Sequence, residues 1–226
     1  MSSGMDKGVE PIGQNWAKRI NTDSEIVKRE FDSYAANYDA QMVVKWGHCA
    51  HTDASRIAAR YLLTEVCILD AGCGTGLSGQ ALHDRSFTHI SGVDLSNQML
   101  KQAEQREVYS SLRQADLNKR LSFEDDAFGV VVCVAVLSHF SNAVPTMLEF
   151  CRVTQPGGYI IFSHRKDLYV KYGYKEQLMK LERSGDWQHV YRSKPMPYLP
   201  NHPEYRDEIL VNYHVYCVLG CVSNKL

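Results

Sequence analysis

"LDAGCGTGLSGQAL", residues 69–82, places Gly72, Gly74 and Gly76 between an apolar run and a helix-compatible segment. A glycine-rich turn after a first strand lets a ligand approach the backbone closely. Dinucleotides, nucleoside triphosphates and S-adenosylmethionine are all bound at turns of this kind. The residues around the turn must therefore decide between these ligands.

From residue 65 onward, short apolar runs alternate with amphipathic segments. The runs include "EVCILDA", "HISGVD", "AFGVVVCVAV" and "GGYIIFSH", and the segments between them include "LSGQALHD", "NQMLKQAEQ" and "AVPTMLEFCRV". Strands that are apolar throughout and are connected by helices indicate a parallel sheet covered on both faces. Right-handed crossovers make such a sheet a doubly wound α/β fold.

The chain is expected to form a single domain with three parts. Residues 1–20 lack periodicity and are expected to form a mobile arm, and residues 65–226 form the core. Between them, residues 21–64 are expected to be helices that cap the active site, with apolar residues at helical intervals. Thr22 and Glu25 have the spacing of a capping box at the start of the first helix.

The residues around the glycine turn exclude two of the ligands. No lysine follows the glycines, so the turn is not a phosphate-binding P-loop. Leu77 stands where a dinucleotide fold has its third glycine, and Asp70, just before the turn, would repel a pyrophosphate. S-adenosylmethionine is cationic and tolerates Asp70, and Asp94, at the end of the second strand, suits its ribose hydroxyls. These residues together favour S-adenosylmethionine.

The motifs along the core resemble those of the class I S-adenosylmethionine-dependent methyltransferases. The resemblance runs from about residue 30 to the end of the chain and rests on "ILDAGCGTG", "GVDLS", "QADL", "FGVVVCVAVLSHF" and "VTQPGGYIIFS". Within this family, "FDSYAANYD" and "YKEQLMKLERSGDWQHV" are most similar to the methyltransferase-like proteins named for the Williams–Beuren syndrome chromosome region.

The resemblance implies a Rossmann-like methyltransferase fold with an N-terminal helical cap. Its sheet would have seven strands and be mostly parallel, with the last strand antiparallel. The runs "WQHVYRSKPMPYL" and "EILVNYHVYCVL" in the tail would then be the sixth and seventh strands.

The resemblance also implies which residues bind the methionine part of S-adenosylmethionine. Asp70 would act on its ammonium group, directly or through water, and Val134 and Ala135 would line the methionine end. The turn would wrap the methionine and ribose parts through Gly72, Cys73 (by its backbone alone), Gly74 and Gly76.

The adenosine part would be bound by residues after the second and third strands. Asp94 would hold the ribose hydroxyls, and Leu95 and Met99 would flank the adenine. Asp116 would accept a hydrogen bond from the adenine amino group, with Leu117 beside the ring.

Three further residues are candidates for the reaction. His139, just past the fourth strand, could accept a proton or orient the acceptor, or it could be a structural histidine at a strand–helix turn. Tyr34 and Tyr38 lie one helical turn apart and could close over the cofactor, as such tyrosines do in similar proteins. Alternatively, they could belong to the apolar face that contains Phe31.

The sequence does not indicate a metal site or a disulfide framework. His48, Cys49 and His51 lie close together without a distant pair of ligands, so we expect no metal and interpret this loop as a cover of the substrate pocket. Seven cysteines without a CxxC pair indicate a reducing compartment, and a cytoplasmic protein is expected.

The partner we expect is a small-molecule acceptor, methylated on oxygen or nitrogen. A net charge of −1 argues against nucleic acid, and no apolar run approaches the length of a membrane span. Motifs of base-methylating enzymes are absent from the sequence. Two alternatives stay open, a protein methyltransferase and a catalytically silent protein that binds S-adenosylmethionine. A monomer or weak homodimer is expected.

Overall fold

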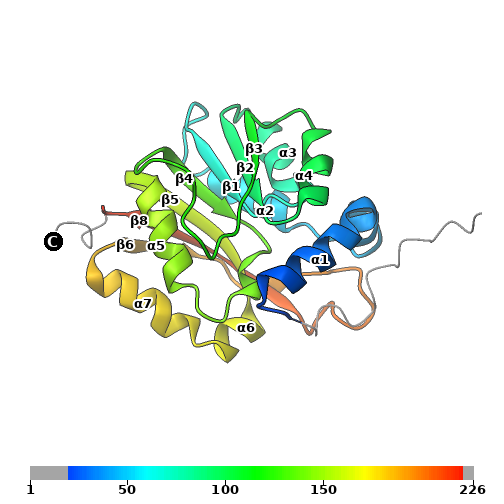
Figure 1. Ribbon diagram of the computed structural model, residues 1–226. Coiled ribbons are helices and arrows are strands. Elements are labelled where there is room, and N and C mark those ends of the chain that lie inside the picture. Colours follow the sequence, from blue (N-terminus) through cyan, green and yellow to red (C-terminus); the bar gives the residue numbers. More distant parts are fainter. Residues whose placement is uncertain (1–19, 221–226) are drawn as a thin grey trace, which may run out of the picture.

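The structure, a computed structural model, describes residues 20–220 of the 226-residue chain. Most of the arm expected at residues 1–20 thus lies outside the described residues. One sheet crosses the molecule in the strand order β3-β2-β1-β4-β5-β8-β6 (Figure 1). Its strands are β1 (Ile68–Ala71), β2 (Ile90–Asp94), β3 (Ser111–Gln114), β4 (Phe128–Cys133), β5 (Thr154–Arg165), β6 (Trp187–Arg192) and β8 (Leu210–Val218). The two-residue β7 (Met196–Pro197) also pairs with β8.

The sheet confirms the doubly wound, mostly parallel architecture. Strands β1 to β5 pair in parallel, whereas β8 enters between β5 and β6 and runs antiparallel to both. The two tail runs are β6 and β8, as the resemblance implied. The chain order reverses beside β1, between β2 on one side and β4 on the other. Ligands of open α/β sheets bind at such a reversal, beyond the carboxyl ends of the strands.

Helices cover both faces of the sheet. Figure 1 shows α5, α6 and α7 together on one side, with α2 behind the strands. The helices are α1 (Ser24–Tyr34), α2 (Ala50–Ala58), α3 (Leu77–His83), α4 (Asn97–Glu104), α5 (Val144–Val153), α6 (Lys166–Lys171) and α7 (Tyr174–Ser184). Two apolar cores result, one beneath α2 and α3 and the other beneath α5 and α7. No helix in residues 20–220 is long and apolar enough to cross a membrane.

The N-terminal segment is helical, but not as one helix from a Thr22 cap. Asp23 is the N-cap of α1, and its carboxylate accepts from the backbone N–H groups of Glu25 and Ile26 at 3.0 Å each. The capping box predicted at Thr22 is therefore wrong, because the aspartate one residue later takes the free N–H groups. After Tyr34 the chain tightens into a 3₁₀ turn, η2 (Ala35–Asn37), and then widens into a π-helix, η3 (Ala40–Lys45).

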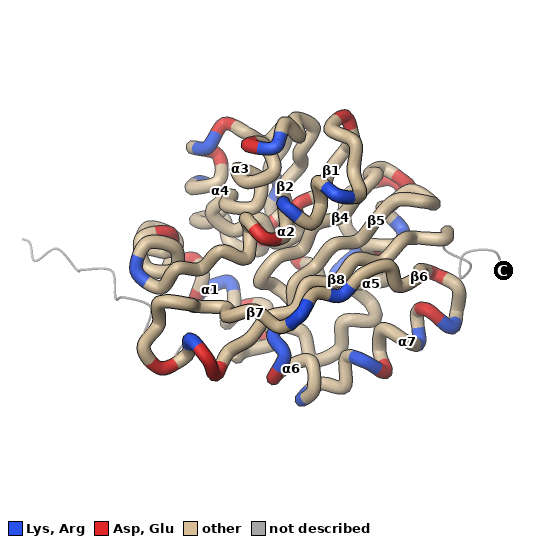
Figure 2. The backbone as a smooth tube through the Cα atoms, turned by 180° about the vertical axis from the view of Figure 1, so that it is seen from behind, with Lys and Arg blue, Asp and Glu red and all other residues tan. Residues whose placement is uncertain are grey.

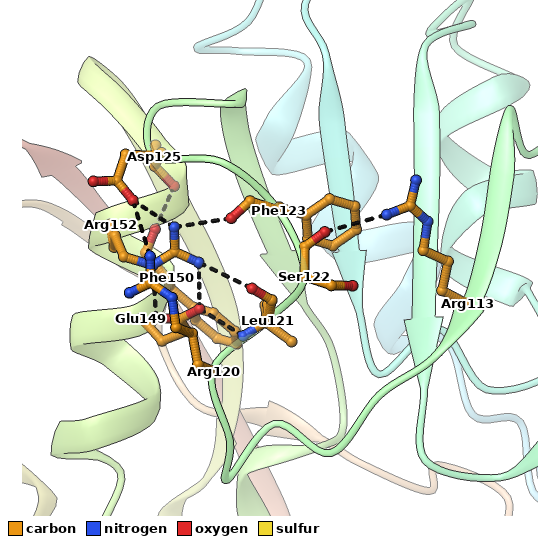
Figure 3. Close-up of polar contacts among 10 residues, drawn as sticks. Arg113, Arg120, Leu121, Ser122, Phe123, Asp125, Glu149, Phe150 and Arg152 are labelled. Atoms are coloured by element: carbon orange, nitrogen blue, oxygen red, sulfur yellow. Dashed lines mark hydrogen bonds and ion pairs between the residues drawn. The ribbon is translucent and has the colours of Figure 1, made fainter.

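The loop between β3 and β4 is tied to α5 by the Arg152 guanidinium, which is 6% exposed (Figure 3). It donates to the carbonyl oxygens of Leu121 and Phe123 at 3.2 and 2.9 Å. It also pairs with Asp125 and Glu149, each at 2.6 Å, and Glu149 accepts from the Leu121 N–H at 2.7 Å. Because the same loop contains residues 116 and 117, this network helps to place two predicted site residues.

Candidate functional site

A cavity of about 970 Å³, including its open mouth, lies where the glycine turn after β1 meets the segment after β4. Its walls bring together twelve of the residues expected from the sequence. These are Tyr38, Gly72, Cys73, Gly74, Asp94, Leu95, Met99, Asp116, Leu117, Val134, Ala135 and His139.

Three of the expected residues are not part of the wall. Gly76 precedes α3 with a φ of +86°, and a side chain there would collide with Arg106. Tyr34 is turned toward the core beneath α2, and its ring meets Phe31 edge-on at 6.4 Å. Asp70 is 1% exposed, behind the turn. Both tyrosine rings contact Phe31, but only Tyr38 lines the cavity.

The glycine turn is open toward the cavity. Gly72 has a φ of +79°, and an added Cβ would lie 2.3 Å from a methyl group of Val136. Gly74 has a φ of +54°, and an added Cβ would have nothing within 4 Å. A side chain is thus excluded at Gly72 by packing and disfavoured at Gly74 by backbone strain. A ligand can reach the peptide groups at Gly74 directly.

Asp94 is held at the tip of β2 by two backbone groups. Its oxygens accept from the N–H of Gly74 and the N–H of Ser96, both at 2.8 Å. Burial raises the pKa of Asp94 to about 6, against the effect of these hydrogen bonds. Each carboxylate oxygen keeps a lone pair for a further donor. This carboxylate can accept from two neighbouring hydroxyl groups, as a ribose presents.

Asp70 has a partner that the sequence analysis missed. The Tyr109 hydroxyl donates to Asp70 Oδ2 at 2.7 Å and accepts from the Gly79 N–H at 3.1 Å. Asp70 Oδ1 is buried without a partner in the described structure, and burial raises the pKa of this carboxyl to about 7. A Cβ at Gly79 would lie 2.2 Å from the Tyr109 ring, and one at Gly92 would lie 2.9 Å from it. The absence of side chains at Gly79 and Gly92 makes room for this ring and was the only trace of it in the sequence of the described residues.

Another part of the cavity wall is formed by Asp116 and the start of α1. Asp116 Oδ1 accepts from the Asn118 N–H at 2.9 Å and from the Ser24 hydroxyl at 3.3 Å. The Thr146 hydroxyl donates to the Leu117 carbonyl at 3.1 Å. Polar acceptors beside Leu117 suit a flat heterocycle with an amino group, such as adenine.

The N-terminal helices are bonded to the edges of the cavity. Asp32 accepts from the Ser96 hydroxyl at 2.6 Å, next to Asp94. Asp39 accepts from the Thr75 hydroxyl at 2.6 Å and pairs with Arg106. Arg106 also donates to the Thr75 carbonyl at 2.6 Å. Residues far apart in the sequence thus join the segment around α1 to the glycine turn and to the end of β2.

His139 ends a short 3₁₀ helix, η4 (Leu137–His139), and its ring faces the cavity. Its Nδ1 lies 2.9 Å from the Asn21 carbonyl oxygen, and its ring meets Phe31 edge-on at 5.4 Å. Since a carbonyl only accepts, Nδ1 carries the proton, and the neutral ring keeps a lone pair on Nε2. Burial lowers the pKa of His139, so the neutral form is the one present at pH 7.

His48 and His51 also line the cavity, and the sequence analysis had assigned only their loop to a pocket cover. Cys49 between them donates toward Asp53, at 3.6 Å. Within residues 20–220, no group of three or more metal-ligating side chains is placed to hold an ion.

Comparison with known proteins finds similarity to methyltransferases. Residues 69–162 match a family described as "Methyltransferase domain". Human "Methyltransferase-like protein 27" is 34% identical over 128 residues, 54% of this chain and 51% of its own. "Ubiquinone biosynthesis O-methyltransferase" of Alkalilimnicola ehrlichii is 29% identical over 136 residues, 55% of this chain and 54% of its own. The chain thus spans about half the length of these curated relatives.

Solved structures share the fold over most of the chain. The magnesium protoporphyrin IX methyltransferase of Synechocystis, solved with bound S-adenosylhomocysteine, superposes with a TM-score of 0.65 at 14% identity. The likeness covers 86% of this chain and 99% of that one. At this identity the likeness shows the fold alone.

Proposed function

We propose, on the premise that residues 69–162 form the methyltransferase domain of a class I S-adenosylmethionine-dependent methyltransferase, that the chain methylates an oxygen or nitrogen atom of a small acceptor. The observation that carries the proposal is the Asp94 carboxylate, fixed by Gly74 and Ser96 beside an open backbone turn. An oxygen acceptor agrees with the curated relative that is named as an O-methyltransferase.

Each part of the cavity has a role in this proposal. Asp94 accepts from the ribose hydroxyls, and Asp116 and Leu117 bind the adenine. The unpartnered Oδ1 of Asp70 supports the ammonium group of the methionine part, directly or through water. S-Adenosylmethionine supplies a methyl group on a positively charged sulfur atom. The chain therefore needs to position an acceptor in line with that bond.

His139 removes or holds the proton of the acceptor. Its Nε2 is the free nitrogen of a ring that the Asn21 carbonyl fixes in one tautomer. A neutral imidazole can take the proton that a hydroxyl or protonated amine loses on methylation. The segment around α1, which contributes the Asn21 carbonyl and Tyr38, closes the same space against water.

Calorimetry tests the cofactor assignment. We expect S-adenosylmethionine and S-adenosylhomocysteine to bind with micromolar dissociation constants and NAD not to bind. Asp94→Ala should weaken the binding of both ligands by about 1–3 kcal/mol, because the ribose hydroxyls lose a charged acceptor. Its thermal unfolding should stay cooperative. Heat from NAD alone, or an unchanged dissociation constant in Asp94→Ala, would contradict the assignment.

A further inference from the structure

Two histidines in the cavity wall have unused hydrogen-bonding groups. His48 is 4% exposed, and neither of its ring nitrogens has a partner in the described structure. Nδ1 of His51 is likewise buried without a partner. Both rings line the cavity, and their centroids are 5.9 Å apart. Buried polar groups are normally hydrogen-bonded, so these nitrogens point to a ligand.

The histidine pair belongs to the side of the cavity near the glycine turn. The His48 ring meets Tyr198 edge-on at 4.8 Å, and Tyr198 comes from the segment before β8. Asp39, which accepts from the Thr75 hydroxyl, is close enough to influence the charge of His51. The groups assigned to the adenine, at Asp116, lie on a different loop.

Few charged side chains line the cavity that contains the pair. The charged residues that line the cavity are Lys28, Asp94 and Asp116, and Lys28 pairs with Asp32 at 2.7 Å. Much of the remaining wall is apolar and includes Phe31, Leu77, Val134, Val136 and Phe140. Burial lowers the pKa of His48 to about 3, so this ring is neutral. A neutral ring offers one donor and one acceptor.

We propose that His48 and His51 form the acceptor-binding end of the cavity and select a neutral molecule that carries a hydroxyl group. This inference rests on the proposed methyltransferase function. A hydroxyl donates and accepts through one oxygen, so it can satisfy one nitrogen of each ring. The ring centroids, 5.9 Å apart, leave room for one oxygen atom that bonds to a nitrogen of each ring at about 2.9 Å. A carboxylate or an ammonium group would lose its hydration against neutral rings and a largely apolar wall, and the charge of Asp39, which reaches His51, further disfavours a carboxylate.

The test uses the full-length chain saturated with S-adenosylhomocysteine. The probes are 4-ethylphenol, 4-ethylbenzoate and 4-ethylbenzylamine, which share a ring and differ in the polar group. We expect calorimetry or ligand-detected NMR to show binding of the phenol alone. His48→Phe and His51→Phe should each weaken its binding at least tenfold, and His48→Gln should recover part of it. His83→Phe, at an exposed histidine, is the matched control and should leave binding unchanged.

The outcomes separate this inference from the function on which it rests. Absence of phenol binding, equal binding to all variants, or tighter binding of the benzoate overturns the histidine assignment. So does a variant that loses S-adenosylhomocysteine but keeps 5′-methylthioadenosine, because the pair would then bind the methionine part. If His48→Phe does not fold, His51→Phe decides. Failure of the wild-type chain to bind S-adenosylhomocysteine counts against the proposed function itself.

Discussion

His139 donates a hydrogen bond from Nδ1 to the Asn21 carbonyl oxygen, and its Nε2 is free to bind a group in the cavity. Because the Asn21 carbonyl holds Nδ1, loss of the ring removes the only group at this position that can accept a proton. We expect His139→Ala to lower the turnover of an identified acceptor by about 10²–10⁴-fold. His139→Gln should be nearly as slow, since an amide can donate but cannot take the proton.

Cofactor affinity provides the control for His139. S-Adenosylhomocysteine should bind both variants within about threefold of the wild type, because the proposal assigns the adenosine part to Asp94, at the end of β2, and Asp116, after β3, whereas His139 follows β4. Near-full turnover in His139→Gln would leave only an orienting role. Near-full turnover in His139→Ala would make it a structural histidine.

Tyr109 acts through Asp70 and is therefore a positioning residue. Tyr109→Phe keeps the ring between Gly79 and Gly92 but removes the hydroxyl that Asp70 Oδ2 accepts from. We expect the affinity for S-adenosylhomocysteine to fall about tenfold, as Asp70 loses its fixed orientation. The affinity for 5′-methylthioadenosine, which lacks the amino-acid part, should not change. Equal weakening of both ligands would mean that Tyr109 only supports the turn.

The predictable residues of the site are those whose neighbours in sequence fix their position. Asp94 and the glycines follow directly from a strand and a turn. Tyr109 is 39 residues from its partner Asp70, and nothing in its own surroundings reveals the contact. The loop of His48 and His51 was expected to cover the substrate pocket, but the role of the two rings was not predicted, because the His48 ring is enclosed by the distant Tyr198. The positions of these residues in the site therefore depend on long-range packing, which a local sequence pattern does not reveal.

At the scale of elements, we propose that the N-terminal helices act as the cap expected from the sequence. Arg106 joins them to the glycine turn through Asp39 and the Thr75 carbonyl. Arg106→Met should cost about 1 kcal/mol of this contact, and S-adenosylhomocysteine should dissociate about fivefold faster. Hydrogen exchange in residues 21–45 should increase.

A surface arginine supplies the comparison for the cap. Arg120→Met removes an exposed ion pair with Asp125, at 3.5 Å. It should change neither the dissociation rate of S-adenosylhomocysteine nor the hydrogen exchange of residues 21–45. If hydrogen exchange in residues 21–45 and the dissociation of S-adenosylhomocysteine are the same in Arg106→Met and in the wild type, the contact does not hold the cap closed.

The order of the elements was largely predictable, but their junctions were not. The apolar runs predicted the strands of the core. The family resemblance predicted that the two tail runs are strands, and these are β6 and β8. The change from α-helix to 3₁₀ and π-helix between Tyr34 and Trp46 follows no periodicity in the sequence. It depends on Met42 and Trp46, which are buried beneath α2 and draw the segment inward.

At the scale of the whole molecule, Figure 2 shows acidic and basic residues interspersed along the helices and loops of residues 20–220. This distribution offers no electrostatic argument for a nucleic-acid acceptor, which supports the proposal of a small molecule. Inside the molecule, several buried groups have pKa values that are shifted from their ordinary values. Burial lowers the pKa values of His48, His164 and His214 to between about 3 and 4. Asp70 and Asp94 shift in the opposite direction.

These shifts have opposite effects on stability. A buried histidine with a lowered pKa stays neutral while the unfolded chain takes up a proton, so stability is lost as the pH falls below about 6.5. A carboxyl with a raised pKa takes up its proton earlier in the folded chain and gains stability over the same interval. A single scan of the wild type mixes both effects, so a histidine has to be tested by difference.

His214 is the histidine best suited to that test. Its ring stacks on Phe162 at 4.9 Å and on Tyr169 at 5.6 Å, and Arg192, His164 and His189 contribute further to its low pKa. In His214→Phe the ring and its stacking remain, but the group that titrates is gone. In urea unfolding without cofactor, the free energy of unfolding of the variant should rise relative to that of the wild type by about 2 kcal/mol as the pH falls from 7 to 5. The same comparison with His83→Phe, at an exposed site, should show no change with pH. A constant gap between His214→Phe and the wild type would mean that His214 titrates alike in the folded and unfolded chain.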